Sequence, residues 1–283
     1  MHSCLNLENG KLVPVAGEHG QVEIYCAPVE EELAGLVAQY NIDRHNLDSA
    51  LDPDENGRLE FEPDHLVVIL KRPRSYCAKD DFFFKVTSVG VFLFAERMLI
   101  VTREELSPFD GKSAFPLRTL HDVLIRLIYS TISHFIGHLK VINMISEELE
   151  DKISKSFENR FLLNMFTLEK SLVYFLNATT ANSMVLEKLK NNAQKIGFTA
   201  DNLEYLDDVT IDNAQCLTLT QTYANILSGL MDARASLISN NLNVMMKHLN
   251  AIVIAVAVPT FFTGLGGMSE FTAITGLDNW PLS

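Results

Sequence analysis

Residues 243–269 read NVMMKHLNAIVIAVAVPTFFTGLGGMS, and the organisation of the whole chain follows from this stretch. Within it, residues 249–269 form a run of 21 without a charged side chain. About 20 apolar residues in a helix cross the hydrocarbon core of a bilayer. A helix buried inside a soluble protein can be equally apolar, but it rarely runs so long and ends in Gly-Leu-Gly-Gly. We therefore predict a membrane-spanning helix.

Charged residues on either side of this run predict its orientation. Arg234, Lys247 and His248 precede it, whereas Glu270 and Asp278 are the only charged residues that follow. Positive side chains near a span are retained on the cytoplasmic side. We therefore expect the large N-terminal part to be cytoplasmic and the short C-terminal tail to face outward.

The composition bounds the possible functions. With 47% hydrophobic residues and a mean hydropathy of +0.10, the chain fits a large soluble part joined to a small membrane part. The net charge of −13 argues against nucleic acid, which is itself a polyanion. This charge suits metal cations, although a solvated acidic surface gives the same balance. The sequence has no P-loop, dinucleotide fingerprint, H-E-x-x-H motif or nucleophile elbow, and we predict that it is not an enzyme.

The first 117 residues mix strand and helix patterns. Residues 28–40 begin with a proline followed by three glutamates, which is typical of a helix N-terminus. Short runs rich in β-branched and aromatic residues predict strands at 21–26, 66–71, 82–87, 89–94 and 98–102. We predict an α/β domain with a mixed sheet.

Helical periodicity replaces this pattern from residue 116 onward. Apolar residues recur at intervals of three and four from Leu117 to Leu139, as in an amphipathic helix. A second helix is predicted over 158–194 and ended by Gly197. A third begins near Asp201 or Asp208 and continues through the membrane span, with a coiled-coil-like apolar spacing that predicts packing against other helices.

Small and polar residues follow one line along the third helix and lead into the span. Asp232 and Asn243 fall on nearly one face because 11 residues complete about three turns. Either the line borders a hydrated path at an oligomer axis, or its Ser and Asn side chains only solvate and hydrogen-bond the stalk. The line contains Asp232, Ser236, Ser239, Asn243, Met246, Asn250, Val253 and Ala257.

The same stretch resembles the pore helix and signature loop of the CorA-type magnesium transporter family. The likeness rests on residues 243–249, 259–264 and 267–269, and it extends to residues 46–52, 58–62, 90–94 and 100–103 of the N-terminal part. The resemblance implies an α+β membrane protein with an α/β cytoplasmic domain (1–117), a helical stalk (118–248), a pore-lining transmembrane helix with its signature loop (249–269) and an outer loop (270–283).

Two features depart from the family pattern. The signature Gly-Met-Asn is altered to Gly267-Met268-Ser269, which puts selectivity for magnesium in doubt. The family also has a second span, and this chain ends at Ser283 where that span would begin, as in a shortened chain or an atypical member.

The resemblance also assigns roles to individual residues. Asp232 matches an acidic ring, Asn243 a pore asparagine, Met246 and Leu249 a hydrophobic constriction, and Asn250 stands where many members have threonine. With Ala257 these six are the expected pore-lining residues. Gly266, Gly267, Met268 and Ser269 are expected to form the selectivity loop. Asp208 is expected to share a regulatory divalent cation with Asp80 or Asp81 of a neighbouring subunit.

We therefore expect a channel that takes up Mg²⁺ down the membrane potential and is closed by cytosolic divalent cation. The resemblance implies a homopentamer in the inner or plasma membrane, multi-pass in the full family pattern, with Co²⁺, Ni²⁺ or Zn²⁺ as other cations. The alternatives are a zinc-transporting relative and a non-conducting, membrane-anchored metal sensor or scaffold. His134 and His138 have zinc-compatible spacing, but without a third ligand in the motif we expect an ordinary helix pair.

Overall fold

The computed structural model describes residues 2–15, 19–77, 80–106, 115–155 and 159–266. The chain divides into two compact units, Met1–Ser228 and Gly229–Ser283, and each is described on its own. The expected signature loop beyond Gly266 lies outside the described residues.

The first unit contains a mixed sheet of seven strands in the order β2-β1-β3-β7-β6-β5-β4. The pair β3–β7 is parallel and the other neighbouring pairs are antiparallel. The predicted α/β domain with a mixed sheet is therefore confirmed. The strands are β1 (His2–Glu8), β2 (Lys11–Pro14), β3 (Val22–Cys26), β4 (Arg58–Phe61), β5 (Leu66–Pro73), β6 (Val86–Leu93) and β7 (Met98–Thr102).

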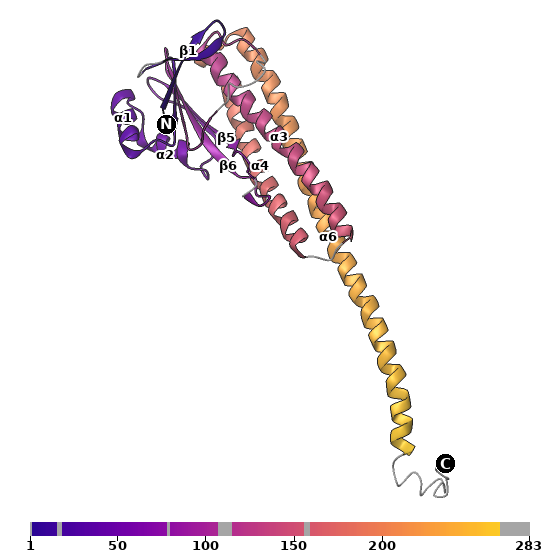
Figure 1. Cartoon of the computed structure of the whole chain (residues 1–283). Coiled ribbons are helices and arrows are strands. Elements are labelled where there is room, and N and C mark those ends of the chain that lie inside the picture. Colours follow the sequence, from indigo (N-terminus) through magenta and orange to yellow (C-terminus); the bar gives the residue numbers. More distant parts are fainter. Residues whose placement is uncertain (1, 16–18, 78–79, 107–114, 156–158, 267–283) are drawn as a thin grey trace, which may run out of the picture. The chain divides into compact units, whose positions relative to one another are not determined.

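Helices cover both faces of the central strands (Figure 1). The short helices α1 (Glu30–Tyr40) and α2 (Arg44–Leu51) lie on one face, and the long helices α3 (Leu120–Lys155) and α4 (Asn159–Asn191) on the other. This explains why β5, β6 and β7 are almost continuously buried rather than alternating. Helix α2 packs so closely on β6 that a Cβ at Gly90 would lie 2.3 Å from the Ala50 side chain.

Helix α4 is fixed to the sheet by an asparagine side chain. Asn182 accepts a hydrogen bond from the Lys71 backbone N–H at 2.9 Å and donates one to the Lys71 carbonyl at 2.7 Å. Lys71 lies in β5 beyond its paired stretch with β4, so its outward backbone groups lack a strand partner on that side. The Asn182 amide supplies both hydrogen bonds that a strand would have made.

The starts of α3 and α6 (Ala200–Gly266) are joined by polar side chains. Asp122 accepts hydrogen bonds from the backbone N–H groups of Arg118 and Thr119, and Thr119 caps the Asp122 N–H in return. The same Asp122 carboxylate accepts a hydrogen bond from Asn202 at 2.5 Å. Between α4 and α6, the short helix α5 (Ala193–Ile196) ends at Gly197 with φ of +90°. The second helix was predicted to run to residue 194 and to be ended by Gly197, but α4 already ends at Asn191.

Most predicted elements of the first unit are confirmed within a few residues, but two predicted strands form one strand, and several other elements were missed. Residues 82–87 and 89–94 were predicted as two strands, but the structure has the single strand β6, because Asp81 and Phe82 adopt positive φ in a turn before it. Strands β1, β2 and β4 and helix α2 were missed. The three strands bury few residues, Cys4 in β1 and Leu59 in β4, so they lack the continuous apolar runs of β5 and β7.

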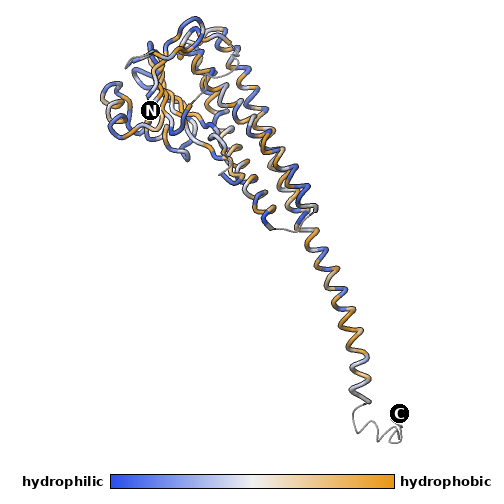
Figure 2. The backbone as a smooth tube through the Cα atoms, viewed as in Figure 1, coloured by the Kyte–Doolittle hydropathy of each residue, from blue (hydrophilic) through white to orange (hydrophobic). Residues whose placement is uncertain are grey.

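In the second unit, α6 continues to Gly266, as the prediction of an unbroken third helix requires. Among the described residues, α6 is the helix that is long and apolar enough to cross a membrane, by length and composition. Its apolar part is exposed all round, and hydrophobic colour follows it toward Gly266 in Figure 2. Val256, Phe261 and Phe262 are each more than 60% exposed. A surface of this kind needs lipid or other helices to cover it.

Candidate functional site

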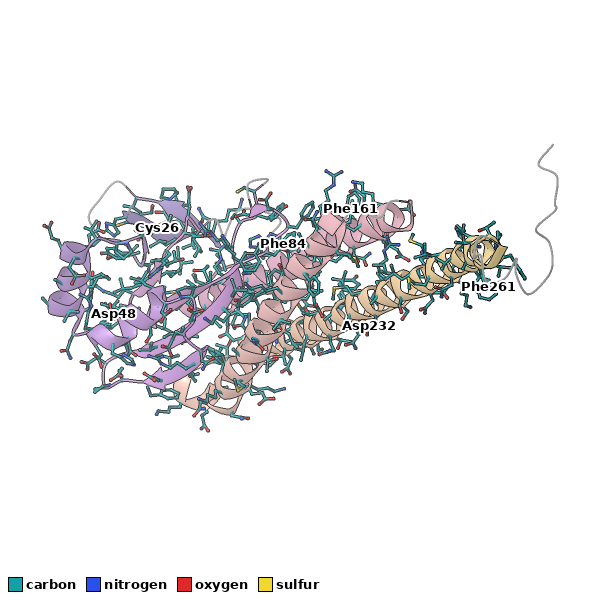
Figure 3. All side chains as sticks on the ribbon, turned by 90° about the horizontal axis from the view of Figure 1, so that it is seen from below. Cys26, Asp48, Phe84, Phe161, Asp232 and Phe261 are labelled. Carbon is teal, nitrogen blue, oxygen red and sulfur yellow. The ribbon has the colours of Figure 1, made fainter. Side chains whose placement is uncertain are left out.

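All six expected pore-lining residues lie on α6 in the second unit. Asp232, Asn243 and Asn250 are exposed in the single chain, and Met246 and Leu249 are 54% and 51% exposed. Figure 3 shows Asp232 partway along this helix and Phe261 near its end. The helix therefore presents these side chains outward, where another subunit could meet them.

Five of the six share one face of α6. At about 100° per residue, Asp232 and Asn250 lie within about 20° of Asn243, Ala257 within about 40° and Met246 within about 60°. Leu249 lies about 120° from Asn243, off the line. The structure thus brings together the polar line on a continuous helix but places Leu249 toward its flank.

Hydroxyl groups along α6 are bonded to the helix itself. Ser236 donates to the Asp232 carbonyl at 3.0 Å, and Thr260 donates to the Val256 carbonyl at 2.8 Å. Such bonds satisfy hydroxyls on a helix surface without a partner from another element. Asn243 and Asn250 differ, because within the described chain neither amide has a hydrogen-bond partner.

Of the expected selectivity loop, only Gly266 belongs to the described residues. Gly266 is the last residue of α6. Gly267, Met268 and Ser269 lie outside the described residues, so their expected role stays a prediction.

The expected regulatory carboxylates do not form a site within one chain. Asp208 lies exposed on α6, next to Asp207, which pairs with Lys190 at 2.7 Å. Asp80 accepts hydrogen bonds from the thiol and the backbone N–H of Cys77, at 2.9 and 2.8 Å, and these bonds lower the pKa of its carboxyl. In the part of the chain that the structure describes, no three His, Cys, Asp or Glu residues form a group that could hold a metal ion.

Asp81 is nevertheless placed for an interaction outside its own chain. Its side chain is exposed, and its backbone adopts φ of +45°, a left-handed conformation that aspartate tolerates. A divalent cation shared with Asp208 would therefore have to bridge two subunits, as the family resemblance implies.

His134 and His138 form a packed pair in α3. Their rings lie 4.4 Å apart, and His138 also packs edge-on against Phe84. Burial, and secondarily His134, lowers the pKa of His138 to about 4, so this imidazole is neutral at neutral pH. Among the described residues no third His, Cys, Asp or Glu joins them in a group that could hold a metal ion, and the two rings pack as a helix pair.

Comparisons with known proteins agree on one family. The model of the family described as CorA-like Mg²⁺ transporter protein matches residues 25–281. The cobalt/magnesium transport protein CorA of Methanocaldococcus jannaschii is 27% identical over 251 residues, which are 86% of this chain and 77% of that protein. The protein of the same name from Thermotoga maritima is 26% identical over 231 residues, 79% of this chain but just under two thirds (65%) of that protein.

A solved structure shares the fold. The complete structure of the CorA magnesium transporter from Methanocaldococcus jannaschii superimposes with a TM-score of 0.80 and 22% sequence identity. The match covers 95% of this chain and 87% of that chain. At this identity the likeness shows the fold alone.

Proposed function

This chain belongs to the CorA-like Mg²⁺ transporter family, and we propose that it forms a divalent cation channel whose conduction path is lined by α6. The family consists of transport proteins, so the prediction that the chain is not an enzyme is confirmed. One observation carries the proposal. A single unbroken helix bears an exposed line of Asp232, Asn243 and Asn250 that leads into a segment apolar enough to span a bilayer.

The polar line needs a closed ring of subunits to enclose a path. An amide facing lipid would leave its hydrogen-bonding groups unsatisfied, which costs several kcal/mol. Helices from identical subunits arranged around an axis would instead turn Asn243 and Asn250 toward water and ions. The family resemblance supports five subunits, and native mass spectrometry of the detergent-solubilised protein measures that number directly.

The driving force requires no chemical reaction. A divalent cation that moves inward across 100 mV gains about 4.6 kcal/mol, since one charge gains about 2.3 kcal/mol. Carboxylates of Asp232 would concentrate cations at the inner mouth, and a ring of Met246 side chains would hold water poorly and close the path by dewetting. Mg²⁺ is the proposed cargo and Co²⁺ a second one, because both homologues are named cobalt/magnesium transport proteins.

Closure would depend on the exposed carboxylates. A cation shared by Asp208 of one subunit and Asp80 or Asp81 of the next would bind only the closed arrangement, and would stabilise it by mass action. Falling cytosolic Mg²⁺ would empty the site and release the subunits. Inward transport and its feedback would thus depend on separate parts of the chain.

Ion flux into liposomes with an inside-negative potential tests the function. Potential-driven Mg²⁺ entry that internal Mg²⁺ suppresses is the expected result. Zn²⁺ entry without Mg²⁺ entry would favour a zinc-transporting relative, for which the altered signature residue Ser269 is the motivating observation. Flux of neither ion would favour a membrane-anchored sensor.

Selectivity is tested at the signature residue. Magnesium sheds its water reluctantly, so a selective mouth would hold the hydrated ion through hydrogen bonds to that water. The Ser269 hydroxyl reaches less far than an asparagine amide. We expect Ser269→Asn to raise the ratio of Mg²⁺ flux to Zn²⁺ flux about fivefold, through a preference of about 1 kcal/mol. An unchanged flux ratio would contradict the assignment of Ser269 to ion selectivity.

A further inference from the structure

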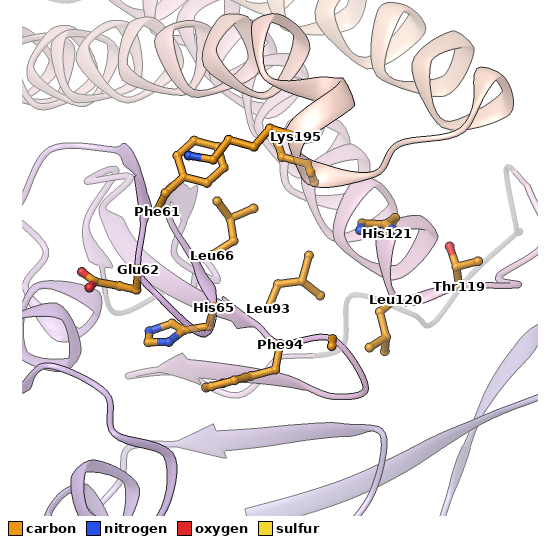
Figure 4. Close-up of a pocket in the computed structure, with 12 residues that line it drawn as sticks. Phe61, Glu62, His65, Leu66, Leu93, Phe94, Thr119, Leu120, His121 and Lys195 are labelled. Carbon is orange, nitrogen blue, oxygen red and sulfur yellow. The ribbon is translucent and has the colours of Figure 1, made fainter.

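Two cavities of similar volume lie in the first unit, and they differ in the charges on their walls. The cavity beside the starts of α3 and α5 has a volume of about 480 Å³, and Lys195 is the one lysine or arginine among the described residues that line it (Figure 4). The second, about 430 Å³, lies where β5 and β7 end and β6 begins, and we call it the sheet-end cavity. Both volumes fall within the range of small-molecule sites, about 300–1,000 Å³. The walls of the sheet-end cavity include Asp54, Arg74, Phe83, Lys85, Arg103 and Tyr174.

Three cationic side chains from separate segments line the sheet-end cavity. Arg74 directly follows β5, Lys85 directly precedes β6 and Arg103 directly follows β7. Arg74 pairs with Glu104, and Lys85 lies 3.9 Å from Asp80, where a partly exposed pair is weak. Arg103 is exposed and has no ion pair within the described chain. In a protein of net charge −13, this convergence of positive charge favours an anionic ligand.

A threonine and an aspartate in the same walls narrow the kind of anion. Thr87 is only 5% exposed, and within the described chain its hydroxyl has no hydrogen-bond partner, so it can donate to a phosphate oxygen. Asp54 is exposed, and its carboxylate has no ion pair among the described residues. This carboxylate would repel a bare polyphosphate. It suits a polyphosphate that carries Mg²⁺, because Mg²⁺ is commonly held by one or two carboxylates together with phosphate oxygens.

The wall formed by α4 and the segment before β6 is aromatic. Phe83 and Tyr174 meet edge to face with their ring centroids 5.8 Å apart, and Tyr174 is 40% exposed. The Lys170 ammonium lies 5.1 Å from the centroid of the Phe83 ring and has no ion pair within the described chain. A planar base packs well on an exposed aromatic ring, whichever hydrogen bonds its edges make.

We propose that the sheet-end cavity binds a nucleoside polyphosphate as its Mg²⁺ complex. Arg74, Lys85 and Arg103 hold the phosphates. The base packs on Tyr174, and Asp54 faces the Mg²⁺ that the phosphates carry. The cavity shares no residue with the proposed conduction path, so ligand binding here does not depend on transport.

Calorimetric titration of the full chain in detergent, with Mg²⁺ constant and in excess, tests the ligand class. ATP carries both the base and the phosphates, inorganic triphosphate lacks the nucleoside, and adenosine lacks the phosphates. We expect ATP to bind, triphosphate to bind at least about fivefold more weakly, and adenosine to show no saturable heat. Removal of Mg²⁺ with a chelator should weaken ATP binding about tenfold. The proposal would be overturned by the absence of ATP binding, by equal affinity for ATP and either of its parts, or by equal ATP affinity with and without Mg²⁺.

Two variants separate the phosphate contacts from the base contact. Arg103→Gln is expected to weaken ATP binding about tenfold. Arg118→Gln is the matched control, because Arg118 is 69% exposed and lies outside the cavity, and it should leave the affinity unchanged. Tyr174→Leu should weaken ATP binding about fivefold and leave triphosphate binding unchanged, since triphosphate has no base.

A third variant tests the role of Mg²⁺ at Asp54. Asp54→Asn should weaken ATP binding in excess Mg²⁺ and strengthen it in the chelator, because it removes both the Mg²⁺ contact and the repulsion of bare phosphate. Asp64→Asn, at an exposed position outside the cavity, should change neither affinity. Circular dichroism confirms that each variant remains folded. Wild-type ATP affinity in both Arg103→Gln and Asp54→Asn would contradict the assignment of the nucleotide to this cavity.

Discussion

Asparagines on the long helices of the two units have opposite environments. In the first unit, Asn182 is fully buried and both ends of its amide are bonded to Lys71, and buried Asn202 is bonded to Asp122. In the second unit, Asn243 and Asn250 are exposed, and within the described chain neither amide has a partner. All four residues lie on long helices, but only the first pair is satisfied inside its own chain.

This difference shows where the asparagine side chains of each unit find their hydrogen-bond partners. Buried polar groups are usually paired in folded proteins, and Asn182 and Asn202 of the first unit follow this rule with partners from their own chain. Polar groups of a membrane segment must also be paired or reach water, because lipid offers no hydrogen bonds. We therefore infer that Asn243 and Asn250 find their partners in other subunits, water or passing ions, whereas Asn182 and Asn202 find theirs within their own chain.

The largest expected effect comes from removing polarity from the second unit. Asn243→Leu should lower Mg²⁺ flux about a hundredfold, because an apolar ring at this level adds a barrier of about 2.7 kcal/mol. The melting temperature should stay that of the wild type, since the amide has no partner within the described chain. Liposome flux and thermal unfolding, measured on the same preparation, check the expected loss of flux and the expected unchanged melting temperature. A large loss of stability would erase the distinction between the two units.

The reciprocal change in the first unit should act on stability. Asn182→Ala leaves the N–H and the carbonyl of Lys71 without partners, and we expect a loss of about 3 kcal/mol in the free energy of unfolding. Asn182→Asp can still accept the hydrogen bond from the Lys71 N–H, so its free energy of unfolding should lie between those of the wild type and Asn182→Ala. Denaturant unfolding of the full chain followed by circular dichroism measures the change, with Asn250→Ala as the control that leaves it unaltered. Equal losses at Asn182 and Asn250 would contradict the comparison.

A third experiment sharpens the comparison at adjacent carboxylates. Asp207 is satisfied within its chain by Lys190, whereas Asp208 is exposed and has no ion pair among the described residues. Internal Mg²⁺ reduces the flux to half at a certain concentration. Asp208→Asn should raise that concentration about tenfold, which corresponds to a coupling free energy of about 1.4 kcal/mol. Asp207→Asn should leave that concentration unchanged. If both variants shifted it alike, the effect would reflect general surface charge.

The smallest effect concerns pH and lies wholly in the first unit. His138 has a pKa of about 4 in the folded protein, below its ordinary value of about 6.5, so the unfolded chain takes up a proton more readily. Stability should therefore decrease as the pH falls from about 6.5 toward 4. His138→Phe should reduce the fall in melting temperature between pH 7 and pH 5 by a few degrees. His65, His121 and His134 also have lowered pKa values, so they account for the pH dependence of stability that remains in the variant.

Sequence patterns predicted the elements that have a continuous apolar run or a sustained period and missed most of the others. Helix α6 and strands β5 and β7 follow sustained periodicity or continuous apolar runs, which result directly from what each element buries. Strand β4, RLEF, has too few residues to establish a period. The positive φ at Asp81 and Phe82 was also not predicted, because neither residue is a glycine.

The sequence by itself determined the membrane helix, the polar line that leads into it and the family resemblance, because these depend on order along one helix. Only the tertiary structure decided which polar residues are satisfied. Asn182 and Asn243 are the same residue type on helices of similar pattern, and no local rule separates them. Asn182 lies against the unpaired edge of β5, more than a hundred residues away in the chain, and hydrogen bonds depend on that proximity in space.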